Sequence, residues 1–179
     1  YVGEMRQLLL NDCRRLDKQR LSMTVQRFVA LGLPDGAPLP EPVPVPQLVS
    51  KEDDQQAAAK RLGVFNKYKP VLALCPGAEF GAAKQWPEEY YAQVAQTWLD
   101  KDWHVWLFGS ANDAAVCGRI NGLTDERCAN LAGRTSLAEA IDLLAMAAFV
   151  VTNDSGLMHV AAALQRPMVA IYGSSDPGF

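Results

Sequence analysis

An apolar run with strand character, residues 149–152, ends at a short turn of small residues, 153–156 (Asn-Asp-Ser-Gly). A helix-like run follows at once over residues 157–164. This order of strand, turn and helix points backbone N–H groups and the positive end of a helix dipole toward the carboxyl edge of a sheet. The chemistry that such a turn offers is the binding of an anionic ligand.

Residues 154–156 can be interpreted in two ways. As a structural element, Asp154 would cap the helix and Gly156 would let the helix pack closely against the sheet. As a site, the N–H groups of Ser155 and Gly156 would bind a phosphate while Asp154 binds a sugar hydroxyl. Each contact between an anion and a helix end contributes about 0.3–2 kcal/mol, so this turn would orient a ligand without holding it tightly.

His159 follows Ser155 by four residues and therefore shares its face of the helix. It is either a ligand-binding side chain or a surface residue. A hydrolytic pair of Ser155 and His159 is not favoured, because a nucleophile elbow needs the pattern Gly-x-Ser-x-Gly and this turn lacks the first glycine. The other histidine, His104, lies inside a predicted strand, which makes it a poor candidate for the base.

The loop of residues 75–87 also follows a predicted strand and precedes a predicted helix, and it carries Gly77 and Lys84. Gly77 would permit a close approach of the backbone to a ligand. Lys84 is either one surface lysine among several or a cation at the same sheet edge as Asp154, where it would neutralise charge on a phosphate leaving group. The chain lacks the Gly-Lys-Ser/Thr of a P-loop and the Gly-x-Gly-x-x-Gly of a dinucleotide site, which argues against a nicotinamide-dependent oxidoreductase.

Two further loops at strand ends complete this edge. Asp113 would either bind ribose hydroxyls or cap the helix that follows it. The loop of residues 133–136 could pass its backbone across an adenine ring. Four glycine-bearing loops at one edge of a sheet indicate a nucleotide crevice more strongly than any one of them does.

The elements that position these loops follow from the hydrophobic pattern, since buried parallel strands are continuous apolar runs and helices show a period of 3.6 residues. The predicted strands are residues 71–75, 104–108, 130–131, 149–152 and 168–172. The predicted helices are residues 14–31, 50–62 with Ser50 as N-cap, 87–100, 112–123, 136–147 with Ser136 and Glu139 as a capping box, and a last one with Asp154 as N-cap. This alternation predicts an α/β fold with a Rossmann-like, doubly wound parallel sheet and right-handed crossovers.

Prolines at alternate positions in residues 38–46 forbid both a helix and a central strand. Residues 34–49 are therefore predicted to be an extended, semi-rigid linker between two parts of the chain. The chain begins at Tyr1 without a methionine and stops at Phe179 directly after a predicted strand-end loop. We therefore expect it to be a piece of a longer protein.

The amino-acid composition and the net charge argue against some classes of function. The 179-residue chain is 49% apolar and carries a net charge of -3, which suits a full core and lacks the basic excess of a nucleic-acid binder. Basic residues prevail as far as Leu33 and acidic ones after it, so the N-terminal part is either a solvated helix face or a surface toward an acidic substrate or membrane.

The four scattered cysteines show no metal-type spacing and favour a reducing cytosol. No apolar run approaches the ~18–20 residues of a membrane span, and no signal peptide is recognisable.

Several motifs together resemble one family. They are residues 75–80 (Cys-Pro-Gly-Ala-Glu-Phe), 84–87 (Lys-Gln-Trp-Pro), 107–110 (Leu-Phe-Gly-Ser), 130–133 (Asn-Leu-Ala-Gly) and 152–159 (Thr-Asn-Asp-Ser-Gly-Leu-Met-His). In this order they are similar to the motifs of the ADP-heptose–lipopolysaccharide heptosyltransferases of glycosyltransferase family 9, most of all to the type that extends the inner core. The resemblance also includes residues 3–6 and 9–12, so it runs along the whole chain.

The resemblance implies a two-domain glycosyltransferase fold (GT-B). The chain would then hold the tail of the N-terminal acceptor domain in residues 1–33 and a truncated, nucleotide-sugar-binding C-terminal domain in residues 50–179. The implied reaction moves heptose from ADP-heptose to the lipopolysaccharide inner core with inversion, and it needs no metal or other cofactor. The implied setting is the cytoplasm of a Gram-negative bacterium, where the enzyme could touch the cytoplasmic face of the inner membrane and would bind no nucleic acid.

The same resemblance implies the roles of single residues. Lys84 would contact the donor phosphates, Asp154 the heptose and Thr135 the region of the adenine, and Lys84 and Asp154 are the predicted catalytic residues. The residues expected at the pyrophosphate are Ser155, Gly156 and His159. A carboxylate proposed as the general base belongs to the absent part of the N-terminal domain, so we expect this chain alone to be inactive. The alternative is a nucleotide-binding fragment or remnant without catalytic activity.

Overall fold

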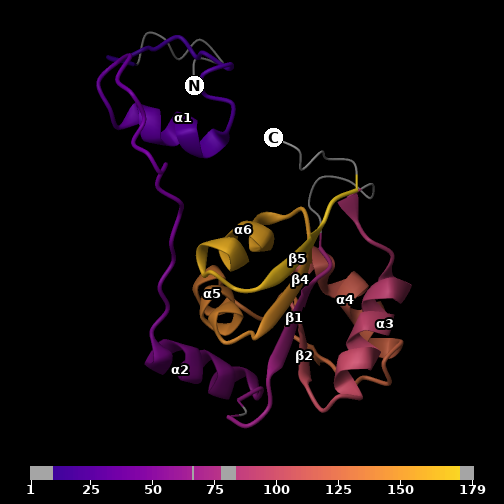
Figure 1. The fold of residues 1–179 in the computed structure, drawn as a ribbon. Helices are drawn as coiled ribbons and strands as arrows, with labels where there is room; N and C mark the ends of the chain where they lie inside the picture. Colours follow the sequence, from indigo (N-terminus) through magenta and orange to yellow (C-terminus); the bar gives the residue numbers. More distant parts are fainter. Residues whose placement is uncertain (1–9, 66, 78–83, 174–179) are drawn as a thin grey trace. The chain divides into compact units, whose positions relative to one another are not determined.

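The computed structural model describes residues 10–65, 67–77 and 84–173, and its contacts divide the chain between Pro46 and Gln47. A small unit precedes this division and a larger unit follows it (Figure 1). Residues 34–46, predicted to be extended, contain neither helix nor strand. The assignment of the two units to an acceptor domain and a donor domain stays a prediction.

The described residues of the small unit contain one helix, α1 (Thr24–Leu31). The prediction of a helix from residue 14 was therefore wrong for its first half. The Asp17 side chain competes with a helix there, because its Oδ1 accepts hydrogen bonds from the backbone N–H groups of Gln19 (2.9 Å) and Arg20 (3.1 Å). Such a side-chain-capped turn replaces the backbone hydrogen bonds of a helix.

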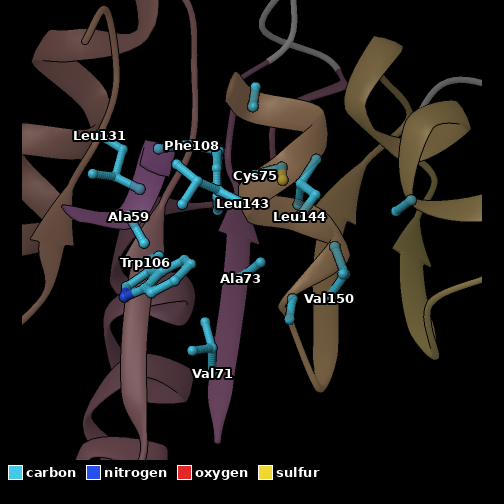
Figure 2. Close-up of a cluster of buried hydrophobic side chains, with 14 of the residues drawn as sticks. Ala59, Val71, Ala73, Cys75, Trp106, Phe108, Leu131, Leu143, Leu144 and Val150 are labelled. Atoms are coloured by element: carbon cyan, nitrogen blue, oxygen red, sulfur yellow. The ribbon is translucent and has the colours of Figure 1, made fainter. Parts of the chain in front are cut away.

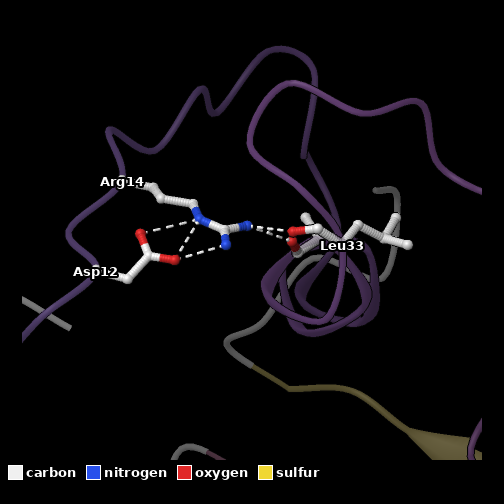
Figure 3. Close-up of polar contacts among 4 residues, drawn as sticks. Asp12, Arg14 and Leu33 are labelled. Carbon is white, nitrogen blue, oxygen red and sulfur yellow. Dashed lines mark hydrogen bonds and ion pairs between the residues drawn. The ribbon is translucent and has the colours of Figure 1, made fainter.

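Arg14 lies beside the C-terminal end of α1 instead of within a helix (Figure 3). Its Nη1 donates to the carbonyl oxygens of Ala30 (3.0 Å) and Leu33 (2.5 Å), and its Nη2 is 2.6 Å from the Asp12 carboxylate. The last carbonyl groups of a helix have no partners within the helix. Arg14 therefore stabilises the end of α1, and Asp12 orients the guanidinium.

The larger unit begins with α2 (Glu52–Leu62), which packs against α5 (Leu137–Ala145). Lys51 is the N-cap residue of α2, so the prediction of Ser50 in that role was wrong. The Ser50 hydroxyl instead donates to Asp142 Oδ1 of α5 at 2.7 Å. The hydroxyl therefore joins two helices rather than capping one.

Five parallel strands form one sheet in the order β3-β2-β1-β4-β5. Their bounds are β1 (Val71–Cys75), β2 (His104–Leu107), β3 (Ala129–Asn130), β4 (Phe149–Asn153) and β5 (Met168–Ile171). The remaining helices alternate with them: α3 (Glu88–Leu99), α4 (Ala114–Gly122) after the 3-10 turn η3 (Ala111–Asp113), α5, and α6 (Gly156–Ala163). The predicted α/β fold with a doubly wound parallel sheet is confirmed.

Helices cover both faces of the sheet: α3 and α4 lie on one side, and α2, α5 and α6 on the other (Figure 1). Successive side chains of a strand point to opposite faces, so β1 contributes to two apolar layers. Figure 2 shows one of these, in which Leu143 and Leu144 of α5 pack with Ala73 and Val150 of the sheet. None of the helices in the described part of the chain is long and apolar enough to cross a membrane.

The strand order places a switch point between β1 and β4. From β1 the chain proceeds to β2 and β3 on one side, and it then crosses over to β4 and β5 on the other side. Connections that leave in opposite directions open a crevice at the carboxyl ends of the two central strands, and open α/β sheets bind their ligands there. The loop with Lys84 follows β1, and Asp154 follows β4.

Candidate functional site

Lys84 and Asp154 meet at this switch point. The Lys84 Nζ atom lies 2.6 Å from Asp154 Oδ2, and the two side chains are 28% and 17% exposed. They are 70 residues apart in the chain, and only the parallel pairing of β1 with β4 brings them together. The predicted convergence of the two loops is present in the structure, whereas the roles of both residues toward a ligand stay predictions.

The ion pair leaves donors available on the ammonium group. A lysine ammonium has three N–H donors and no acceptor, so a hydrogen bond to Asp154 leaves room for contacts to a phosphate. Because both side chains are partly buried, their interaction is screened less by solvent than that of an exposed pair. The arrangement can therefore bind an anion while Asp154 keeps the lysine in place.

The helix after β4 begins one residue later than predicted. Ser155 is the N-cap residue of α6 and Gly156 is its first helical residue, so Asp154 pairs with Lys84 instead of capping the helix. A Cβ atom added to Gly156 would meet no described atom within 4 Å. Close packing of helix and sheet therefore does not explain this glycine, whereas open space beside the first N–H groups of α6 suits an anion.

Asn153 and Tyr91, which the sequence patterns did not indicate, also belong to this edge. Asn153 is fully buried, and its Oδ1 accepts hydrogen bonds from the Tyr91 hydroxyl (3.0 Å) and the Trp86 N–H (3.2 Å). Burial raises the pKa of Tyr91 far above its usual range, so the phenol stays a hydrogen-bond donor. One signal could have revealed Asn153: an amide at the end of a continuous apolar strand needs partners nearby.

Asp113 packs against two glycines. Its Oδ2 accepts hydrogen bonds from the Ser110 N–H (2.8 Å) and the Ser110 hydroxyl (2.7 Å), in the capping box of η3. Asp113 is the N-cap residue of α4, but its side chain makes no capping hydrogen bond to that helix. A Cβ atom added to Gly77 would lie 2.6 Å from Asp113 Cγ, and one added to Gly109 would lie 2.6 Å from Asp113 Cβ. Gly77 thus makes room for Asp113, and a contact of Asp113 with ribose stays a prediction.

The other predicted residues lie at the ends of helices that flank the edge. His159 is an exposed residue of α6. Thr135 directly precedes Ser136, whose side chain forms the predicted capping box with Glu139 at the start of α5. Contacts of His159 and Thr135 with a ligand stay predictions.

Several motif residues named above lie outside the described residues. These are residues 3–6 and 9, residues 78–80 of the motif after β1, and the stretch from Ser174 onward. Within the described part of the chain, no group of three or more His, Cys, Asp or Glu residues could hold a metal ion. All four cysteines are free thiols, and Cys75, Cys117 and Cys128 are buried.

Fold and geometry together define an α/β domain with a lysine–carboxylate pair and a helix N-terminus at its switch point, the position at which open α/β sheets bind their ligands. The family model for glycosyltransferase family 9 (heptosyltransferase) matches residues 1–179. The chain belongs to this family.

Two relatives and one solved structure illustrate the similarity. The chain is 44% identical to lipopolysaccharide heptosyltransferase 2 of Escherichia coli K12 and 43% identical to lipooligosaccharide heptosyltransferase 2 of Haemophilus influenzae, in each case over 100% of this chain and 54% of the relative. The solved structure of E. coli ADP-heptose lps heptosyltransferase II superimposes with a TM-score of 0.93 at 43% identity, covering 99% of this chain and 56% of that one. The chain thus spans about half the length of the relatives it matches.

Proposed function

We propose that the larger unit binds ADP-heptose and serves a transferase that moves heptose onto the lipopolysaccharide inner core. The ion pair of Lys84 and Asp154, 2.6 Å apart at the switch point, carries this proposal. Family membership and the similarity to heptosyltransferases that act on lipopolysaccharide support the substrate class. The N-terminal unit would then belong to the acceptor side of the longer protein, with residues 34–49 as the connection.

The proposed reaction is a displacement with inversion at the anomeric carbon. An acceptor hydroxyl oxygen forms the new bond to that carbon while the bond to the β-phosphate oxygen of ADP breaks. The hydroxyl proton passes to a base outside this chain. Negative charge grows on the departing diphosphate, and a preorganised ammonium group stabilises such charge more strongly in the transition state than in the ground state.

Each residue at the edge has one role in the proposed reaction. Lys84 faces the diphosphate, Asp154 orients Lys84 and accepts a hydrogen bond from a heptose hydroxyl, and the N–H groups of Ser155 and Gly156 contact phosphate oxygens. Asp113 and Thr135 would face the ribose and the adenine, and His159 the pyrophosphate. Because Lys84 supplies the countercharge, the proposed chemistry requires no metal ion. The proposed setting is cytoplasmic, with peripheral contact to the inner membrane through the acceptor.

Replacement of Lys84 tests the proposal. We expect Lys84→Ala to weaken binding of ADP to the 179-residue chain by a factor of about 10–100, since a hydrogen bond to a charged group contributes about 1.5–3 kcal/mol. Isothermal titration calorimetry with ADP and with ADP-heptose measures this. In the full-length transferase the same change should lower kcat by a larger factor than it weakens donor binding.

Lys69→Ala is the matched control. Lys69 also pairs with a carboxylate, that of Asp102, but both residues precede strands and therefore lie at the opposite edge of the sheet. This variant should keep the affinity for ADP. Equal affinities of Lys84→Ala and the unmodified chain would contradict the proposal. Binding of donor without transfer by the longer protein would favour the non-catalytic alternative, and no binding of either ligand would favour a remnant.

A further inference from the structure

Asn153 is a fully buried polar residue at the end of β4, directly before Asp154. Buried strands of a parallel sheet consist mainly of apolar residues, and a buried amide is unfavourable unless its hydrogen bonds are made. The identity of its partners therefore shows what this position contributes beyond packing.

The three hydrogen-bond partners that the described residues offer the Asn153 amide lie on one part of the chain. Nδ2 donates to the Pro76 carbonyl oxygen at 2.6 Å, while Oδ1 accepts from the Trp86 N–H and the Tyr91 hydroxyl. Pro76 and Trp86 flank the stretch that contains Lys84, and Tyr91 lies on α3, which follows it. A single side chain thus joins the end of β4 to Pro76 and to Trp86, which lies two residues after Lys84.

The carboxylate partner is held by its own backbone. Asp154 follows Asn153 in the chain, and its N–H donates to the Ile171 carbonyl oxygen of β5 at 3.1 Å. Trp86, two residues after Lys84, packs edge-on against the Tyr91 ring with centroids 5.1 Å apart. A free lysine side chain populates many rotamers, so a backbone anchored at Trp86 reduces the number of places that the ammonium can occupy.

We propose that Asn153 is the positioning residue of the donor site. It sets Lys84 against Asp154 and so presents the ammonium group to the diphosphate of the donor, with Tyr91 holding the amide in orientation. This inference rests on the proposed function, because it gives Lys84 its role toward the diphosphate. A purely structural amide would change the stability of the fold and leave the coupling to Lys84 unaffected.

A double-mutant cycle with ADP as the probe tests this. The four chains are the unmodified one, Asn153→Ala, Lys84→Ala and the double variant; ADP dissociation constants come from NMR titration into the millimolar range, and stabilities from urea unfolding. We expect Asn153→Ala to weaken ADP binding about tenfold in the unmodified background and not at all in the Lys84→Ala background, since residues that act as a unit are non-additive. Its effect on unfolding should be equal in both backgrounds.

Two further variants keep the test decisive. Tyr91→Phe preserves the ring and removes the hydroxyl, which donates to Asn153 Oδ1 at 3.0 Å and to the Cys75 carbonyl oxygen at 3.4 Å. It should show the same coupling to Lys84 in smaller size even if Asn153→Ala does not fold. Thr124→Val is the matched control, since Thr124 is equally buried but follows α4, away from the ion pair, and this variant should keep the ADP affinity. Additive losses of ADP affinity would overturn the positioning role of Asn153. Unchanged affinity in Lys84→Ala alone would instead overturn the proposed function.

Discussion

At the scale of single residues, His104 is a half-buried titratable group away from the site. It begins β2, and its Nε2 atom is buried without a hydrogen-bond partner among the described residues. Burial lowers the pKa of His104, the nearby charge of Lys69 lowers it further, and Asp102 opposes both. The charged imidazolium is therefore disfavoured in the folded state.

Stability should consequently fall on mild acidification. Because the pKa of His104 is lower in the folded than in the unfolded chain, the unfolded chain binds more protons below a pH of about 6.5. The free energy of unfolding should decrease as the pH falls from 6.5 through the folded pKa, by at most about 1.4 kcal/mol per pH unit for one proton. Urea unfolding of the unmodified chain and of His104→Gln measures this, and the variant should show the smaller slope. A His104 NMR resonance that titrates at or above pH 6.5 would contradict the expectation.

The sequence was sufficient to predict that Lys84 and Asp154 lie at the same edge of the sheet. It was not sufficient to predict the contact between their side chains. Both residues follow continuous apolar strands, so parallel pairing alone places them at one edge. The N-cap prediction for Asp154 was wrong because a lysine 70 residues away in the chain competes for its carboxylate. Asn153 and Tyr91 were missed for the same reason, since their partners are distant in sequence and become neighbours only in the folded sheet.

At the scale of elements, the loops after β1, β2 and β3 support one another at the carboxyl edge. Asp113 fits against Gly77 and Gly109, and a Cβ atom on Gly133 would lie 3.1 Å from the Cα of Ala111. The backbone N–H of Gly133 also donates to the Gly109 carbonyl oxygen at 3.0 Å. A side chain added to one loop would therefore displace its neighbour.

We expect Gly77→Ala to lower the free energy of unfolding by about 1–3 kcal/mol, the usual cost of an overpacked position. It should also weaken ADP binding, because the displaced Asp113 loop borders the site. Gly118→Ala in α4 is the matched control, since a Cβ atom there would meet nothing within 4 Å, and alanine within a helix stabilises by about 0.5–1 kcal/mol relative to glycine. Urea unfolding compares the two. Equal free energies of unfolding of the two variants would contradict this expectation. They would show that Asp113 moves away from a Cβ atom at position 77 without a loss of stability.

Elements were easiest to predict where burial is complete. The bounds of β1 agree with the prediction because both of its faces are covered and its apolar run is continuous. The helix expected over residues 14–31 was wrong because apolar spacing cannot reveal that Asp17 closes a turn. Ser136 with Glu139 was predicted correctly as a capping box because all its partners lie within one turn of helix.

At the scale of the whole molecule, the larger unit should unfold as a separately observable body. All four tryptophans, Trp86, Trp98, Trp103 and Trp106, lie after Gln47, so tryptophan fluorescence reports on this unit. Its core consists of the two apolar layers on either side of the sheet. Loss of one buried side chain should thus appear in the fluorescence transition.

Leu143→Ala should lower the free energy of unfolding of the larger unit by about 2–5 kcal/mol, because it removes a fully buried side chain and leaves a cavity. Leu137→Ala is the matched control on the same helix, since Leu137 is 68% exposed, and it should change the stability by no more than about 0.5 kcal/mol. Urea titrations followed by tryptophan fluorescence compare the two. Similar losses in both variants would contradict the assigned core.

The most direct test of the central claim is an NMR titration of the ¹⁵N-labelled 179-residue chain with ADP. ADP, which is part of the proposed donor, should bind where β1 and β4 diverge. The backbone amide signals of Lys84, Ser155 and Gly156 should therefore shift with a single binding curve. The signals of Lys69 and Asp102, at the opposite edge of the sheet, should stay in place. Shifts confined to that opposite edge, or no shift at several millimolar ADP, would contradict a donor site at the switch point.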